Sequence, residues 1–131
     1  MAYEVRCLVE NRVYMLILPE ELTSSALQEC DSMLIGILDQ MPNKIHLIVD
    51  MRAHKITSHI NDARNLKHTR HANLGRMLLV GLRINPTARF IVSLVAQIAG
   101  MPYKDFATEQ EAFDYLHDVE GIVIPTASSA K

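Results

Sequence analysis

The first hydrophobic pattern along the chain is an alternation of apolar and charged residues, and the later patterns are nearly continuous apolar runs. Apolar and charged residues alternate over residues 3–9, which predicts a strand with one solvated face. Residues 13–18 and 45–49 are almost uniformly apolar, which predicts strands buried on both faces. A similar run at 77–80 and a short segment at 103–106 bring the predicted strands to five. The apolar face of the first strand consists of Tyr3, Val5, Cys7 and Val9.

Two of the segments between these strands have apolar residues at helical spacing, which predicts helices there. Ser25 and Gln28 form a candidate capping box at the start of the first helix. Its apolar face consists of Leu27, Cys30, Leu34, Ile37, Leu38 and Met41. A weaker amphipathic helix is expected to start near Ser58, with apolar positions at Ile60, Ala63 and Leu66.

Two more helices have clear start signals. Asn85 is followed by Pro86, and this pair predicts an N-cap with proline at the first helical position. Thr108 and Glu111 form a second candidate capping box. Gly121 is expected to end the last helix.

The predicted order of elements is β-β-α-β-α-β-α-β-α, without repeats or low-complexity linkers. Strands that alternate with helices require parallel crossover connections. We therefore expect one α/β domain over residues 1–124, with a mixed, mostly parallel sheet of about five strands and four helices. Residues 125–131 are expected to form a frayed tail.

Composition narrows the classes of function. The net charge of −2 and the pI near 6.3 argue against a dedicated nucleic-acid binder, which would usually be basic. The longest uncharged run, residues 90–103, is shorter than the ~20 residues of a membrane-spanning helix. The chain starts directly with a strand pattern rather than a secretory signal, so a cytoplasmic location is expected. Cys7 and Cys30 are expected to be buried, reduced thiols.

Charge is concentrated after the third predicted strand. Residues 52–76 contain six Lys/Arg and one acid, Asp62, although the chain as a whole is acidic. The candidate partner surface consists of Arg52, Lys55, His59, Arg64, Lys67 and Arg70. Such charge speeds encounter with an acidic protein partner, whereas the absence of aromatic residues from this window disfavours base stacking. The alternative is an exposed helix face without a partner.

The order of elements, with Val49 and Asp50 ending the third strand after an opening hairpin, resembles the STAS superfamily. This superfamily includes domains of sulfate transporters and the soluble, SpoIIAA-like anti-sigma-factor antagonists. Residues 103–116 also resemble the end of SpoIIAA-like proteins, where a short strand precedes a helix rich in acidic residues. The similarity covers about residues 3–120. It implies a STAS/SpoIIAA-like fold and a regulatory, protein-binding role.

The resemblance also implies a candidate phosphorylation site. In the antagonists, a partner kinase phosphorylates a serine at the start of the helix after the third strand, and Ser58 or Thr57 corresponds to it. The acid and glycine that flank that serine in the family are absent here, where Ile56 and His59 surround the two hydroxyls. Phosphate at a helix N-terminus meets free N–H groups and a favourable dipole. The alternative is that Ser58 only caps the helix.

Two further clusters suggest ligand chemistry. His68 and His71 are three residues apart on a candidate helix, but zinc needs three or four ligands, so a solvated polar face is expected and no metal. Arg83 and Arg89 flank Asn85 at a helix start, which is a candidate anion-binding corner. The alternative for that corner is a capped helix with surface arginines.

The helix expected at 87–99 is apolar around most of its circumference. It either packs on several sides, forms a homodimer interface, or binds a small apolar or lipid-like ligand. No glycine-rich phosphate loop or nucleophile elbow is present, so we expect a chain that is not an enzyme and uses no cofactor. Carriage of a small apolar or amphipathic ligand is the alternative to the regulatory role.

Overall fold

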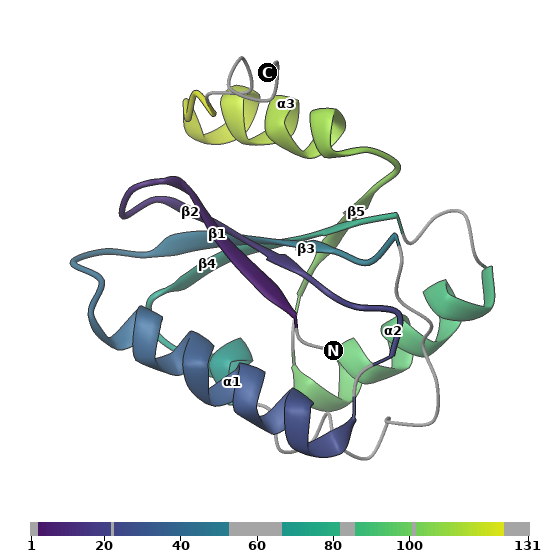
Figure 1. The fold of residues 1–131 in the computed structure, drawn as a ribbon. Helices are drawn as coiled ribbons and strands as arrows, with labels where there is room; N and C mark the ends of the chain where they lie inside the picture. The colour runs from purple at the N-terminus through teal and green to yellow at the C-terminus, as the bar shows by residue number, and fades with distance from the viewer. Residues whose placement is uncertain (1–2, 22, 53–66, 82–85, 101, 125–131) are drawn as a thin grey trace.

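A single five-stranded sheet organises the molecule (Figure 1). The computed structural model describes residues 3–21, 23–52, 67–81, 86–100 and 102–124. The strands are β1 (Glu4–Val9), β2 (Val13–Ile17), β3 (Ile45–Asp50), β4 (Leu74–Val80) and β5 (Lys104–Phe106). They lie side by side in chain order, with β1 antiparallel to β2 and the other three pairs parallel. The predicted single α/β domain with a mixed, mostly parallel sheet is confirmed.

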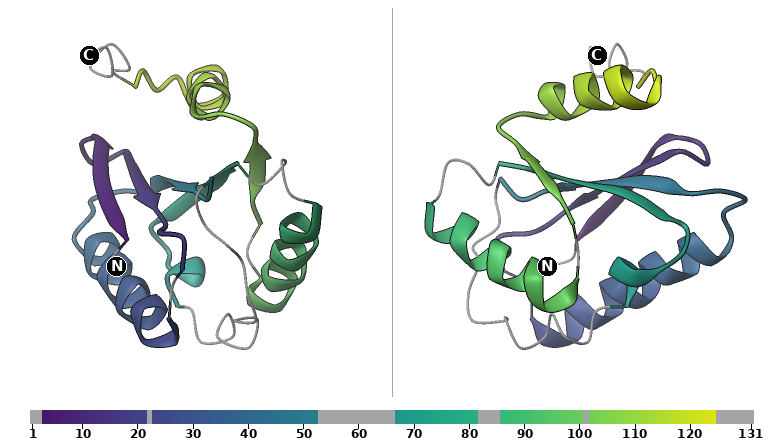
Figure 2. Two further views of the ribbon diagram at one scale, coloured as in Figure 1. Left: turned by 45° about the vertical axis from the view of Figure 1, so that its right-hand side comes forward. Right: turned by 180° about the vertical axis from the view of Figure 1, so that it is seen from behind.

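Helices cover both faces of this sheet. Within the described residues they are α1 (Ser24–Asp39), α2 (Pro86–Ala99), α3 (Glu109–Glu120) and a short 3-10 helix, η2 (His68–Arg70). Helices α1 and α2 lie against one face, and α3 lies against the other (Figures 1 and 2). The fourth predicted helix, near Ser58, and the predicted tail at 125–131 lie outside the described residues.

Alternating residues of the central strands build one hydrophobic core on each face. Leu47 and Val49 of β3 point toward α1 and α2, whereas Ile48 points toward α3. The first core also contains Leu16, Cys30, Leu34, Met77, Leu79 and Val92. The second contains Val13, Met15, Leu78, Val80, Phe106, Ala112, Leu116 and Ile122. Because both faces are covered, every residue of β3 is buried, as its apolar run predicts.

The helix ends confirm one predicted cap and correct another. Thr108 caps α3, with its hydroxyl 3.1 Å from the Glu111 N–H, and Gly121 ends that helix in the left-handed conformation. The cap of α1 is Thr23, whose hydroxyl accepts from the Ala26 N–H at 3.1 Å. The predicted capping box at Ser25 is therefore wrong, because the extended backbone that a cap requires occurs two residues earlier.

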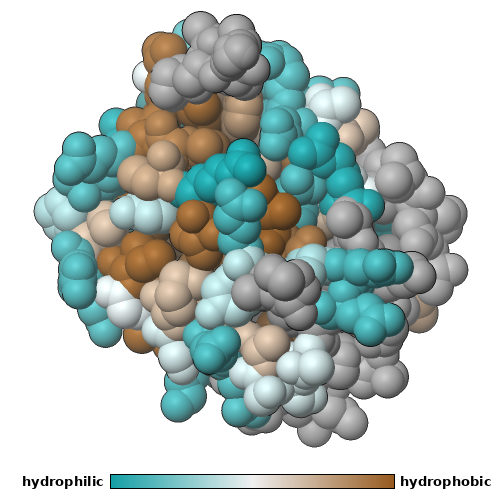
Figure 3. Space-filling view, viewed as in Figure 1, coloured by the Kyte–Doolittle hydropathy of each residue, from teal (hydrophilic) through white to brown (hydrophobic). Residues whose placement is uncertain are grey.

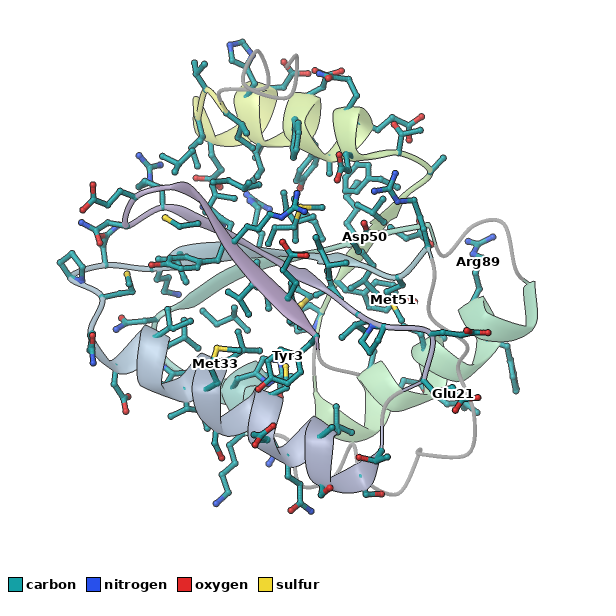
Figure 4. All side chains as sticks on the ribbon, in the orientation of Figure 1. Tyr3, Glu21, Met33, Asp50, Met51 and Arg89 are labelled. Carbon is teal, nitrogen blue, oxygen red and sulfur yellow. The ribbon has the colours of Figure 1, made fainter. Side chains whose placement is uncertain are left out.

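The edge strand β1 departs from its predicted alternation. A bulge between Cys7 and Val9 moves Val9 to the α3 side of the sheet, while Tyr3 and Val5 pack on the α1 side. Figure 4 shows Tyr3 near Met33 of α1, which packs against the same core. Cys7 is exposed, so its predicted burial is wrong, and only Cys30 is a buried thiol. Figure 3 shows hydrophobic groups at the surface of the side on which β1 lies.

Helix α2 starts at Pro86, as the Asn85–Pro86 signal predicts, although Asn85 itself lies outside the described residues. Its polar residues Arg89, Ser93 and Gln97, which are spaced four apart, form an exposed stripe. Phe90, next to that stripe, is also 65% exposed. Across the described ranges, no helix is both long and apolar enough to cross a membrane.

Candidate functional site

The carboxyl ends of the parallel strands meet at one edge of the sheet, and Asp50 ends β3 there. In register, Asp50 pairs with Ile17 of β2 and with Val80 of β4, so these three residues mark the same edge. Ligand and partner sites of open α/β sheets gather outside this edge. The residues just beyond β3 are therefore the first candidates for function.

Arg52 is clamped by two carboxylates at this edge. Its backbone N–H and its Nε both donate to Asp50 Oδ1, at 3.0 and 2.9 Å, and its Nη2 donates to Asp50 Oδ2 at 2.7 Å. The same Nη2 reaches Glu109 Oε2 of α3 at 3.2 Å. This contact links the end of β3 to the first turn of α3.

The clamp depends on burial and on a close backbone approach. Burial alone would raise the pKa of Asp50, but the hydrogen bonds and charge of Arg52 outweigh it, and the pKa lies below its ordinary value. Gly81 has φ +92, and a Cβ there would lie 2.4 Å from Arg52 Cγ. Only glycine fits this position, because both the conformation and the contact exclude a side chain. Asp50 is buried, while the Arg52 side chain remains 47% exposed.

The three described members of the predicted partner surface do not lie on one patch. Arg52 is at the carboxyl edge, whereas Lys67 and Arg70 lie at the other end of the connection, just before β4 and beside α1. A parallel crossover leaves one strand at the carboxyl edge and enters the next at the amino edge, which separates the two ends. The remaining predicted members, Lys55, His59 and Arg64, lie outside the described residues, as do the candidate phosphorylation sites Ser58 and Thr57.

Sequence reasoning missed a buried carboxylate–imidazole pair. Asp31 Oδ1 lies 2.6 Å from His68 Nδ1 and 2.9 Å from the His68 backbone nitrogen, and both Asp31 oxygens accept from the Lys67 N–H. Burial lowers the pKa of His68, although the Asp31 hydrogen bond acts in the opposite direction. Asp31 follows Cys30 on the apolar face of α1, so an acid at a core position was the signal available.

The other histidine and arginine predictions are settled only in part. His68 is buried, so its predicted solvated face is wrong, and His71 Nε2 lies 2.6 Å from Asp39 Oδ1. Within the described ranges, no three His, Cys, Asp or Glu residues are grouped as metal ligands.

Of the predicted anion corner, Arg83 and Asn85 lie outside the described residues. Arg89, on the first turns of α2 (Figure 4), lies 3.4 Å from Asp105.

A small apolar cavity of about 150 Å³ lies between the sheet, α1 and α2. Its lining includes Leu16, Leu34, Met77 and Val92, with His68 also contributing. A cavity of this size and character can hold a benzene-sized ring.

Compared with the models of known protein families and with curated proteins, the chain matches none of them.

Proposed function

We propose that this chain is a non-enzymatic regulatory module that binds a protein partner at the carboxyl edge of its sheet, as the STAS and anti-sigma-factor antagonist domains it resembles do. Two features support this proposal. The sheet opens with an antiparallel hairpin that is followed by parallel strands, which fits the order of elements on which the resemblance rests. The residues that would carry the switch, Thr57 and Ser58, come seven and eight positions after Asp50, the last residue of β3.

The observation that carries the proposal is the clamp formed by Asp50, Arg52 and Glu109. It fixes the backbone where the connection leaves β3, because Asp50 holds both the backbone N–H and the guanidinium of Arg52. A partner surface that starts from a fixed point loses less conformational entropy on binding. Phosphate at Ser58 or Thr57 would add a charge of about −2 a few residues beyond this point and change the attraction for a partner.

The experiment measures recovery of a partner from cell extract by tagged wild-type chain and by surface variants. Arg6 is exposed, and its charge acts on Asp50 and Glu109, so Arg6→Glu alters the field at this edge. Lys104 is also exposed, but it lies on β5, the outer strand on the far side of the sheet from β1, with its ammonium over the Tyr115 ring. This position makes Lys104→Glu the matched control. We expect Arg6→Glu and Ser58→Asp to change the recovery of one partner by about fivefold or more. Lys104→Glu should leave the recovery unchanged.

Equal recovery with all three variants would refute the carboxyl edge as the binding surface. An equal effect of Arg6→Glu and Lys104→Glu would show a general charge effect and refute the placement as well. If only Ser58→Asp has no effect, the switch is refuted while the surface stands.

The apolar cavity favours a second candidate, a carrier of a small apolar ligand. Its volume of about 150 Å³ limits the ligand to a single ring or a short chain, rather than a phospholipid. Native mass spectrometry of gently purified protein tests this candidate. A reproducible mass above that of the protein, removed by Val92→Trp, would support it, and a mass of protein alone would count against it.

A further inference from the structure

His46 lies in the buried strand β3, with its imidazole held in one orientation. Its Nδ1 accepts a hydrogen bond from the Arg76 backbone N–H at 2.9 Å. Gly75 allows this approach, because a Cβ at that position would lie 2.7 Å from His46 Nδ1. Since Nδ1 is the acceptor, Nε2 carries the proton of the neutral ring.

The Nε2–H group of His46 has no acceptor within hydrogen-bond distance in the described part of the chain. Glu120 Oε1 lies 3.8 Å away, which is too far for a hydrogen bond. The side chain is only 9% exposed, and burial lowers its pKa, so the ring is neutral near pH 7. His46 lines a groove, so its Nε2–H can donate there to solvent or to a ligand.

This donor lies in the wall of a groove at the amino edge of the sheet. The groove has a volume of about 460 Å³, which is the size of a small-molecule site. Arg12, Lys44 and Arg76 contribute positive charge to it, and Glu120 contributes the one acid among the described lining residues. Arg76 Nε is 2.6 Å from Glu120 Oε2, so this pair is largely neutralised.

Arg12 and Lys44 supply the uncompensated charge. Arg12 is half-buried and near enough to influence the pKa values of His46 and Glu120. Lys44 is exposed at the rim, one residue before β3. The groove therefore presents donors from several directions, namely an imidazole N–H, a guanidinium and an ammonium, with a net positive charge.

We propose that this amino-edge groove binds a phosphoryl group, either as free phosphate or as a small phosphomonoester. A phosphate accepts hydrogen bonds on several tetrahedrally arranged oxygens, which suits donors that approach from different elements. The His46 Nε2–H and the Arg12 guanidinium hold the oxygens, and Lys44 adds charge at the rim. The volume beyond one phosphate leaves room for an organic substituent. The groove lies at the opposite edge from the proposed partner surface. An experiment that refutes phosphoryl binding therefore leaves the proposed partner binding untouched, and the reverse also holds.

Titration of the full chain with inorganic phosphate and with phenyl phosphate tests the proposal. Isothermal calorimetry gives the affinity, and nitrogen-15 NMR follows the His46 ring. We expect saturable binding and a shift of the His46 Nε2 resonance. Tighter binding of phenyl phosphate assigns a monoester, and equal binding assigns the free anion; either outcome supports the groove. Sodium chloride at matched ionic strength controls for screening.

Charge-removing variants locate the site. Arg12→Gln should weaken phosphate binding about tenfold or more, because it removes a charge-assisted hydrogen bond. Lys67→Gln removes an exposed charge beside α1 instead and should change the affinity by less than about twofold. Absence of saturable binding, an unmoved His46 resonance, or equal weakening by both variants would overturn the proposal. The NMR measurement needs no variant, so misfolding cannot obscure it.

Discussion

Two aspartates on helix α1 make the same contact with a histidine in different surroundings, which allows a matched test of burial. Asp31 and Asp39 each place an oxygen 2.6 Å from a ring nitrogen, of His68 and His71 respectively. The Asp31 side chain is 8% exposed, whereas that of Asp39 is 64% exposed. We expect Asp31→Ala to destabilise the protein strongly and Asp39→Ala to have little effect.

The magnitude follows from the donors that each carboxylate satisfies. Removing Asp31 leaves the His68 ring N–H, the His68 backbone N–H and the Lys67 backbone N–H without their acceptor. A buried unsatisfied donor costs about 1–3 kcal/mol, and water can reach Lys67, so the total is about 3 kcal/mol. An exposed pair is worth about 0.5 kcal/mol. Asp39 is also the last residue of α1, where a negative charge opposes the helix dipole, which reduces its effect further.

Urea unfolding followed by circular dichroism measures both variants. With a denaturant slope of about 1.5 kcal/mol per molar, Asp31→Ala should lower the midpoint by about 2 M urea. Asp39→Ala should lower it by less than about 0.5 M. If Asp31→Ala does not fold, Asp31→Asn, which keeps one carbonyl acceptor, should show an intermediate loss. Equal shifts for Asp31→Ala and Asp39→Ala would refute the reasoning, because burial would then not decide the cost.

Three further predictions concern pH, thiol reactivity and a glycine. Folding lowers the pKa values of His46 and His68, so below about pH 6.5 the unfolded chain binds protons that the folded chain does not. Stability should therefore fall as pH decreases through that value, and a urea midpoint that rises on acidification would contradict the burial of these rings. Burial raises the pKa of the Cys30 thiol to about 12, so a thiol reagent should label Cys7 alone in the native state, as peptide mass mapping would show. Gly81→Ala should lower the thermal midpoint by several degrees, since it combines a positive φ with a clash against Arg52, whereas the exposed helical change Gly36→Ala should not.

Local pattern was enough to predict the strands and most helix boundaries. The run before Asp50 is apolar except for His46, which is typical of a strand covered on both faces, and β3 is buried throughout. Thr108 and Glu111 act within one turn, so their capping contact is visible in the sequence. The position of Val9 on the α3 side was not predictable in this way, because the bulge that ends the alternation of β1 depends on pairing with β2.

The polar clusters were missed because they join residues far apart in the chain. Asp31 and His68 are brought together only when η2 packs beside α1. The same is true of His46 and Arg76, which meet because β3 and β4 are neighbours. Each cluster nevertheless left a local sign. Each sign is a polar side chain at an apolar position, namely an acid on the apolar face of a helix and a histidine inside an apolar strand. Such a side chain needs a hydrogen-bond partner, because its apolar neighbours cannot provide one.

The two edges of the sheet differ in how completely their polar groups are satisfied, and this difference separates anchoring from ligand binding. At the carboxyl edge, the buried Asp50 carboxylate accepts three hydrogen bonds from Arg52, so the network is closed without any ligand. At the amino edge, the His46 ring is fixed by Arg76 but keeps its second nitrogen without an acceptor in the described chain, beside the charges of Arg12 and Lys44. That nitrogen lies in the lining of the groove, where solvent or a ligand can accept its proton in a hydrogen bond. A bound anion would be such an acceptor, and the clamp at the other edge would serve to hold the start of a partner-binding segment.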